Sequence, residues 1–207
     1  DQEIFIGRGI FFGLNVSLKF PAFLQQSPWS LFSAGLVLPP GKIDFPFSLV
    51  GIDSQGRANI QPGWMLKYGA FNLIRSEHKF KERNRSKRND FAIKVFDTQT
   101  AKWVLQAILV LKAVPVQDEY FEISIPGLGA CVLKESSRQK ALSFYKIFAE
   151  RYLLDKLMEV LEKSPHLLRE NVETSRLISG ELMRGFSKEV SLPKTSALIP
   201  KRFRRFE

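Results

Sequence analysis

The densest group of ionisable side chains lies between Lys79 and Asp90, in the sequence KFKERNRSKRND. This stretch, called here the basic segment, contains two acidic residues and one large apolar residue, Phe80. Its six cations are Lys79, Lys81, Arg83, Arg85, Lys87 and Arg88. Because clustered Lys and Arg neutralise phosphates and release counterions, the chemistry that this segment predicts is recognition of a nucleic-acid backbone.

Aromatic residues accompany both basic clusters of the chain. Phe80 and Phe91 lie at the two ends of the basic segment, where their rings would stack on unpaired bases. The chain closes on KRFRRFE, whose cations are Lys201, Arg202, Arg204 and Arg205. We therefore predict a nucleic-acid-binding protein, with RNA or single-stranded DNA favoured and the final cluster assisting the basic segment.

Three other interpretations of the basic segment remain open. It would also suit a solvated loop that keeps neighbouring strands from pairing, or a targeting signal. An anionic membrane surface is a further partner for such a cluster, in a matrix-like or scaffold protein. A structural or packaging role in a virus or a mobile element would suit a small basic chain of this kind.

Residues suited to catalysis or metal binding are few. The two histidines, His78 and His166, are far apart in the chain, and the one cysteine, Cys131, lies in the apolar sequence GACVL. A zinc site needs more Cys and His ligands, and Cys131 fits a small buried residue. We therefore predict no catalytic residue, no metal and no cofactor, and keep as a further hypothesis an enzyme whose site is assembled from dispersed residues.

The composition fits a globular chain with a polyanionic partner. The 207 residues are 44% hydrophobic and carry a net charge of +10, and the 18 Phe greatly outnumber the 4 Tyr. A single cysteine fits a reducing compartment, either cytoplasmic or nuclear. The first residue is Asp rather than Met, which suggests a processed or truncated N-terminus.

The elements that must position the basic segment are predicted as strands. Apolar residues alternate from Ile10 to Phe20, which is typical of a half-buried strand. Further strands are expected at Lys42–Val50, Trp64–Ile74, Phe91–Phe96, Lys102–Val114, Glu119–Ile125 and Ala130–Lys134. Asp97–Thr100 is interpreted as a hairpin turn, and no internal repeat is recognised. Residues 1–134 are thus expected to form an antiparallel β-rich sandwich or barrel-like domain, with the basic segment 79–90 as a long loop.

The pattern changes to a helical period near Glu135. Apolar residues then recur every three or four positions, which predicts a helix over 138–163 and a second over 166–184. The fold class is therefore α+β, with a helical hairpin at 135–186 and an extended basic tail at 187–207. We expect the two helices to offer a surface for a homo-oligomer or another protein partner.

Overall fold

The computed structural model describes residues 2–88, 93–116, 119–124, 130–163 and 201–202. The fold is mixed α/β, as the succession of strand and helix patterns predicts, with several sheets and four helices in the described part of the chain. None of the helices in those residues is both long enough and apolar enough to cross a bilayer.

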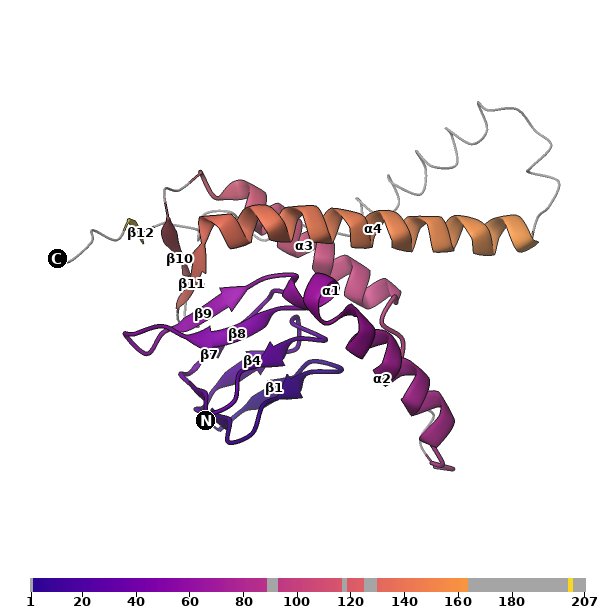
Figure 1. The fold of residues 1–207 in the computed structure, drawn as a ribbon, viewed down its shortest axis with the longest axis horizontal. Coiled ribbons are helices and arrows are strands. Elements are labelled where there is room, and N and C mark those ends of the chain that lie inside the picture. Colours follow the sequence, from indigo (N-terminus) through magenta and orange to yellow (C-terminus); the bar gives the residue numbers. More distant parts are fainter. Residues whose placement is uncertain (1, 89–92, 117–118, 125–129, 164–200, 203–207) are drawn as a thin grey trace.

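Residues 2–52 form a coil of short strands stacked in parallel (Figure 1). Its strands are β1 (Ile4–Ile6), β2 (Phe11–Phe12), β3 (Ser17–Leu18), β4 (Ala22–Leu24), β5 (Leu31–Phe32), β6 (Val37–Leu38), β7 (Gly41–Lys42) and β8 (Leu49–Ile52). They stack as β1-β4-β7, β2-β5-β8 and β3-β6, all in parallel register. Successive turns of a solenoid pair in this way, with each turn contacting the next.

A backbone conformation repeats from one turn of the coil to the next. Gly9, Trp29 and Phe47, two residues before β2, β5 and β8, all have φ between 58° and 66°. Asn15 and Gly35 stand in the same relation to β3 and β6 and also have positive φ. This is an internal repeat that the sequence did not reveal, because a glycine in one turn corresponds to a bulky aromatic residue in the next.

The coil corrects the expected antiparallel pairing of residues 1–134. The alternating run Ile10–Phe20 is not one strand but is divided between β2 and β3, because the strands of the coil are only two to four residues long. The inward side chains still come from alternating positions, and Leu24, Phe32 and Leu38 are buried among the core residues of the coil. Within the run Ile10–Phe20, Phe12, Val16 and Leu18 pack against the core, whereas Leu14 is 87% exposed. Periodicity therefore identified part of the core-facing residues but not the partner strands.

The stack β2-β5-β8 continues beyond the last turn of the coil and becomes part of a seven-stranded sheet. β8 pairs antiparallel with β9 (Ala58–Gln61), and β9 pairs parallel with β11 (Ala130–Lys134). β10 (Tyr120–Ser124) lies antiparallel beside β11, and β12 (Lys201–Arg202) lies on the outer edge of β10. The strands expected at Glu119–Ile125 and Ala130–Lys134 are thus confirmed.

Two expected strands are helices. Trp64–Ile74 forms α1 (Trp64–Tyr68) and the start of α2 (Ala70–Arg83), and Lys102–Val114 lies within α3 (Thr98–Ala113) and its C-cap. The β-branched residues of α3 suggested a strand, but its buried residues Ala101, Val104, Ala107 and Leu111 follow a helical period.

The interpretation of Asp97–Thr100 as a hairpin turn is also wrong. Asp97 is the N-cap of α3, and its Oδ1 accepts a hydrogen bond of 2.7 Å from the Thr100 N–H. An Asp before a helix satisfies an unpaired N–H of the first turn in this way. Within the expected strand Phe91–Phe96, residues 93–96 do not form a strand, and Phe91 lies outside the described residues.

The long helix expected over 138–163 is confirmed as α4 (Glu135–Lys163). It crosses the end of the coil and runs beyond it (Figure 1). Phe148 of α4 packs on Phe47 with ring centroids 5.0 Å apart, and the Tyr145 hydroxyl donates a hydrogen bond of 2.6 Å to the Pro46 carbonyl. The second expected helix, 166–184, lies outside the described residues, as does all of the tail 187–207 except β12.

Arg138 joins α4 to the end of α3. Its side chain is buried, and Nη1 donates hydrogen bonds to the carbonyls of Leu111 and Val114 at 2.7 and 3.0 Å. The same guanidinium pairs with both carboxylate oxygens of Glu135. Arg138 therefore satisfies carbonyls at the C-terminal end of α3 while its own charge is balanced.

Replacing Arg138 with Met should destabilise the fold by about 3–5 kcal/mol, because the Leu111 and Val114 carbonyls and the partly buried Glu135 carboxylate would all lose their cationic donor. The measurement is the free energy of unfolding in urea. The matched control is Arg151→Met, which removes an exposed i,i+4 pair with Asp155 and should cost roughly 0–1 kcal/mol. Equal losses of unfolding free energy in the two variants would show that Arg138 contributes no more to stability than an exposed ion pair.

Gly63→Ala should destabilise the fold more than Gly35→Ala. Both glycines have a left-handed backbone, with φ of 68° and 71°, which costs an L-residue about 1–2 kcal/mol. A Cβ at Gly63 would in addition come within 3.3 Å of the Tyr145 ring, whereas a Cβ at Gly35 meets no atom within 4 Å. Urea unfolding of the two variants measures the difference, and a smaller loss for Gly63→Ala would show that the Tyr145 ring adapts freely.

Candidate nucleic-acid interface

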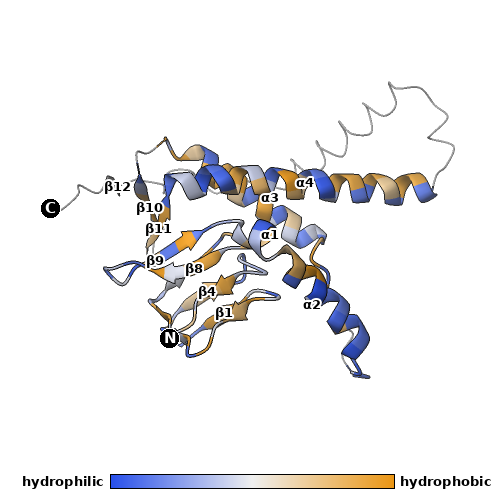
Figure 2. Cartoon of the chain, viewed as in Figure 1, coloured by the Kyte–Doolittle hydropathy of each residue, from blue (hydrophilic) through white to orange (hydrophobic). Residues whose placement is uncertain are grey.

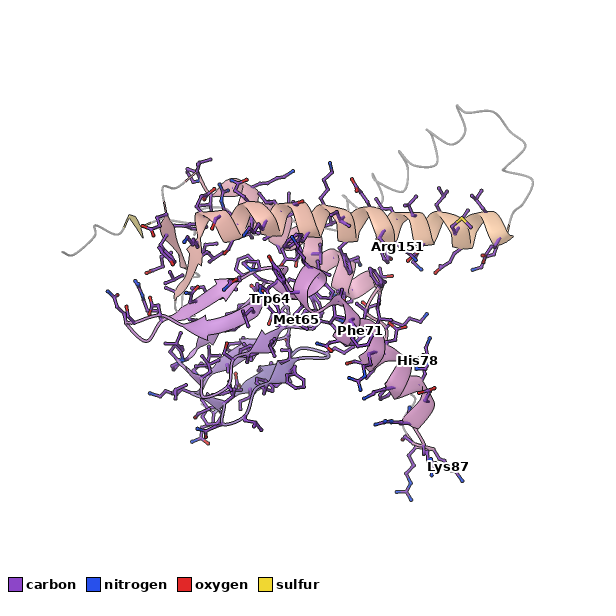
Figure 3. All side chains as sticks on the ribbon, in the orientation of Figure 1. Trp64, Met65, Phe71, His78, Lys87 and Arg151 are labelled. Carbon is purple, nitrogen blue, oxygen red and sulfur yellow. The ribbon has the colours of Figure 1, made fainter. Side chains whose placement is uncertain are left out.

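The basic segment is not a loop over its whole length, because its first part belongs to α2. This helix projects from the body of the protein, and Phe71, His78 and Lys87 mark the path from its base to the turn beyond its tip (Figure 3). Hydrophilic residues dominate the distal half of α2 (Figure 2). Within the predicted loop 79–90, Lys79–Arg83 is thus corrected to the end of a helix, which an exposed turn at 84–88 follows. Residues 89 and 90 lie outside the described residues.

Local interactions explain why this charged sequence is helical. Lys81 pairs with Glu77 one turn earlier, and His78 lies 3.3 Å from Glu82 in the same i,i+4 relation. Lys81 and Arg83 stand in the last turn, where cations interact favourably with the helix dipole.

The base of α2 is fixed to the body of the protein. Leu73 is the buried residue of the helix, and the Glu77 carboxylate accepts a hydrogen bond of 3.0 Å from the Val95 N–H. Val95 itself is buried in the core. Beyond Glu77, every residue from Lys81 to Arg88 is exposed. The helix therefore holds its cations outward from a rigid base.

Three cations form a column along one face of α2. Arg75, Lys79 and Arg83 are four residues apart, and none forms an ion pair with a described residue. The pKa of Lys79 is lowered, first by the charge of Arg75 and then by desolvation and the charge of Arg83. The three like charges therefore stand together without an ion-paired carboxylate among the described residues, and a bound polyanion would relieve their repulsion.

Arg75 was not among the residues predicted from the sequence. The expected strand ended at Ile74 and the basic segment began at Lys79, so Arg75 was assigned to neither. The spacing 75, 79, 83 was the available signal, since positions four apart share a helix face.

The other predicted site residues lie in several places. Lys81 is on a different face of α2, and Arg85, Lys87 and Arg88 are exposed in the turn after it. Lys201 and Arg202 form β12, which lies away from α2 (Figure 1). Phe91, Arg204 and Arg205 lie outside the described residues. The structure therefore brings the cations of 79–88 together but does not place β12 beside them.

A groove of about 650 Å³ lies between α2 and the first turns of the coil. One wall is the face of α2 that carries Arg75, Lys79 and Phe80, and the other is the turn from Gly9 to Phe11. Trp64 and other residues of the α1 region complete the lining. Volumes of this size are typical of small-molecule and cofactor pockets.

Aromatic rings line this groove with much of their surface free. Phe11 is 65% exposed and Tyr68 is 53% exposed, although both are large apolar side chains. The Trp64 and Tyr68 rings are 5.1 Å apart, and Lys67 Nζ lies 5.5 Å from the centre of the Tyr68 ring. Exposed aromatic rings beside cations are the combination that single-stranded nucleic acids bind.

Two contacts hold the coil wall of the groove in place. Arg8 forms an ion pair with Asp97, the N-cap of α3. Gly9 lies against the ring of Trp29, where a Cβ would clash, and its φ of 66° favours glycine as well. The groove therefore has a fixed wall on the coil side as well as on the α2 side.

Cys131 is buried and free, as its apolar surroundings predict. Burial raises the pKa of its thiol to about 12, and the charges of Asp44 and Glu122 add to this shift. A thiol in this state is not a nucleophile near neutral pH. Within the described residues, no three His, Cys, Asp or Glu side chains come together as a metal site.

The geometry of α2 and its groove is thus the main guide to function. Comparisons of the chain with protein-family models, with curated proteins and with solved structures gave no match. The site must accordingly be interpreted from its own charges and rings, and these combine a cation column with an aromatic groove.

Proposed function

We propose that this protein is a non-enzymatic nucleic-acid-binding protein, with RNA or single-stranded DNA favoured. Its backbone-binding surface is the outer part of α2 and the following turn. The observation that carries the proposal is the column Arg75–Lys79–Arg83, in which like charges stand together without carboxylate partners among the described residues. Phosphates of a nucleic-acid strand would supply the missing counter-charge.

The projection of α2 supports a long polyanion over a small anion. The cations continue past the helix end through Arg85, Lys87 and Arg88, so the charge extends along a line. Lys and Arg neutralise successive phosphates along such a line. A single small anion would need the cations to converge on one point.

The remaining parts of the chain complete the proposal. The final cluster Lys201–Arg205 would contact a more distant part of the same strand. The division into a β-rich domain, a helical hairpin at 135–186 and a basic tail at 187–207 remains a prediction, and so does a homo-oligomer or protein partner on the helices. A reducing compartment, cytoplasmic or nuclear, and a packaging role in a virus or mobile element belong to the same proposal.

One observation favours a second candidate, binding to an anionic membrane surface. Phe71 and Ile74 on the outer side of α2 are 74% and 64% exposed, and cations follow them along the helix. A helix with apolar and basic faces can lie in a lipid interface. Co-sedimentation with phosphatidylserine vesicles tests it, and a Phe71→Ala variant should then lose most of the binding.

Replacing the six cations of the basic segment with Ala should flatten the salt dependence of nucleic-acid binding. Each lost phosphate contact lowers the slope of log K against log salt by about 0.7 for a single strand. Fluorescence anisotropy with a labelled oligonucleotide over a salt series measures this slope.

The matched control removes the same number of charges from elements other than α2. It replaces six exposed cations of α3, β11 and α4: Lys112, Lys134, Lys140, Lys146, Arg151 and Lys163. The control should keep most of the slope, because the slope reports direct phosphate contacts and salt largely screens charges that lie more than about 10 Å from the bound strand. Equal flattening in both variants would rule out the basic segment as the binding site.

Arg75→Ala should weaken oligonucleotide binding more than Lys81→Ala. Arg75 belongs to the unpaired column, whereas Lys81 is on another face and lies 3.7 Å from Glu77. Each substitution removes one positive charge from the same helix, so the two variants differ in face and pairing. Equilibrium binding at fixed salt compares them, and a larger loss for Lys81→Ala would assign the contact to the opposite face of α2.

A further inference from the structure

We infer that the groove between α2 and the first turn of the coil receives unpaired bases of a single strand, with Phe11 and Tyr68 as the stacking residues. The inference rests on the proposed function, because the cations of α2 would hold the backbone of the same strand. The groove is a second site beside the cation column, and the Phe11 and Tyr68 rings account for the preference for single strands.

Two aromatic rings in the groove are exposed to solvent. Phe11 lies on the coil wall of the groove and Tyr68 on the side of α1, and both are more than half exposed. Burying such rings would normally stabilise the folded chain, so their exposure in a groove of about 650 Å³ indicates a surface that a ligand covers. Bases bind aromatic faces without regard to sequence, since every base offers a π-face.

The charges beside the rings indicate which ligand covers them. Arg75 and Lys79 lie in the lining of the same groove, and Lys67 stands 5.5 Å from the Tyr68 ring centre. An apolar peptide would gain nothing from these cations. A nucleotide has a flat ring and an anionic phosphate a short distance apart, so one strand would satisfy both the rings and the column.

Duplexes do not fit this arrangement. Paired bases are stacked on one another, and their faces are closed to Phe11 and Tyr68. A duplex would therefore meet only the cations, and its affinity should follow phosphate contacts alone. The groove thus separates single strands from duplexes, whereas the cation column binds both.

The experiment uses the full chain and three labelled ligands: an oligothymidylate, an abasic strand of equal length with the same phosphates, and a blunt duplex. Wild-type protein should bind the oligothymidylate at least about 5-fold more tightly than the abasic strand, as expected for one or two stacked bases. Phe11→Ala/Tyr68→Ala should bring this ratio close to one while the abasic strand binds as before. Quenching of tryptophan fluorescence by the oligothymidylate alone gives a second readout, because two of the three tryptophans, Trp29 and Trp64, line the groove.

Phe71→Ala is the matched control, because it removes an exposed ring from α2 at a position outside the groove lining. It should keep the wild-type ratio. Unfolding in urea checks that the double variant is folded, as expected from the exposure of both rings.

The outcomes distinguish a failure of the groove as the base site from a failure of the cation column as the phosphate site. If the double variant keeps the preference for the oligothymidylate, or if Phe71→Ala removes it, the groove is not the base site, while salt-dependent binding of the abasic strand still supports the proposed function. If the abasic strand does not bind at low salt, the cation column is not a phosphate site and the proposed function fails. Binding of phosphatidylserine vesicles in place of every oligonucleotide would overturn both.

Discussion

The packing of α4 on the last turn of the coil is the contact on which the rest of the structure depends. A stack of parallel strands ends on an apolar layer that must be covered. Phe148 covers it by packing on Phe47, and the Tyr145 hydroxyl donates to the Pro46 carbonyl. Burial raises the pKa of Tyr145, so the hydroxyl keeps its proton and the hydrogen bond. Gly63 completes the contact, because any larger residue there would meet the Tyr145 ring.

That contact also determines where the candidate site lies. α1 begins directly after Gly63, and α2 leaves the body at Gly69, so both helices start from the covered end of the coil. Only Leu73 of α2 is buried, and the rest of the helix is free to present charge. The body thus holds α2 at its base through Leu73, while the cations from Lys81 to Arg88 are exposed.

The site combines two kinds of chemistry from separate parts of the chain. The cations lie within a few turns of one helix, whereas the rings come from β2, α1 and α2. Charge acts over about 10 Å at ordinary salt and suits capture of a strand, but stacking acts only on contact. Placing the groove beside the column allows captured backbone and inserted bases to belong to the same strand.

The sequence alone determined the surface chemistry, the buried character of Cys131, the strands β10 and β11 and the long helix α4, because composition and a sustained period suffice for these. It did not determine the parallel coil, since alternation marks the core-facing residues of a strand and not its partner. It also misassigned α2 and α3, where exposed Phe71 and β-branched Val104 resembled strand residues. The cation column Arg75–Lys79–Arg83 exists only because α2 is helical. The aromatic groove exists only because α2 lies beside the first turn of the coil, so only the tertiary structure could establish these two features.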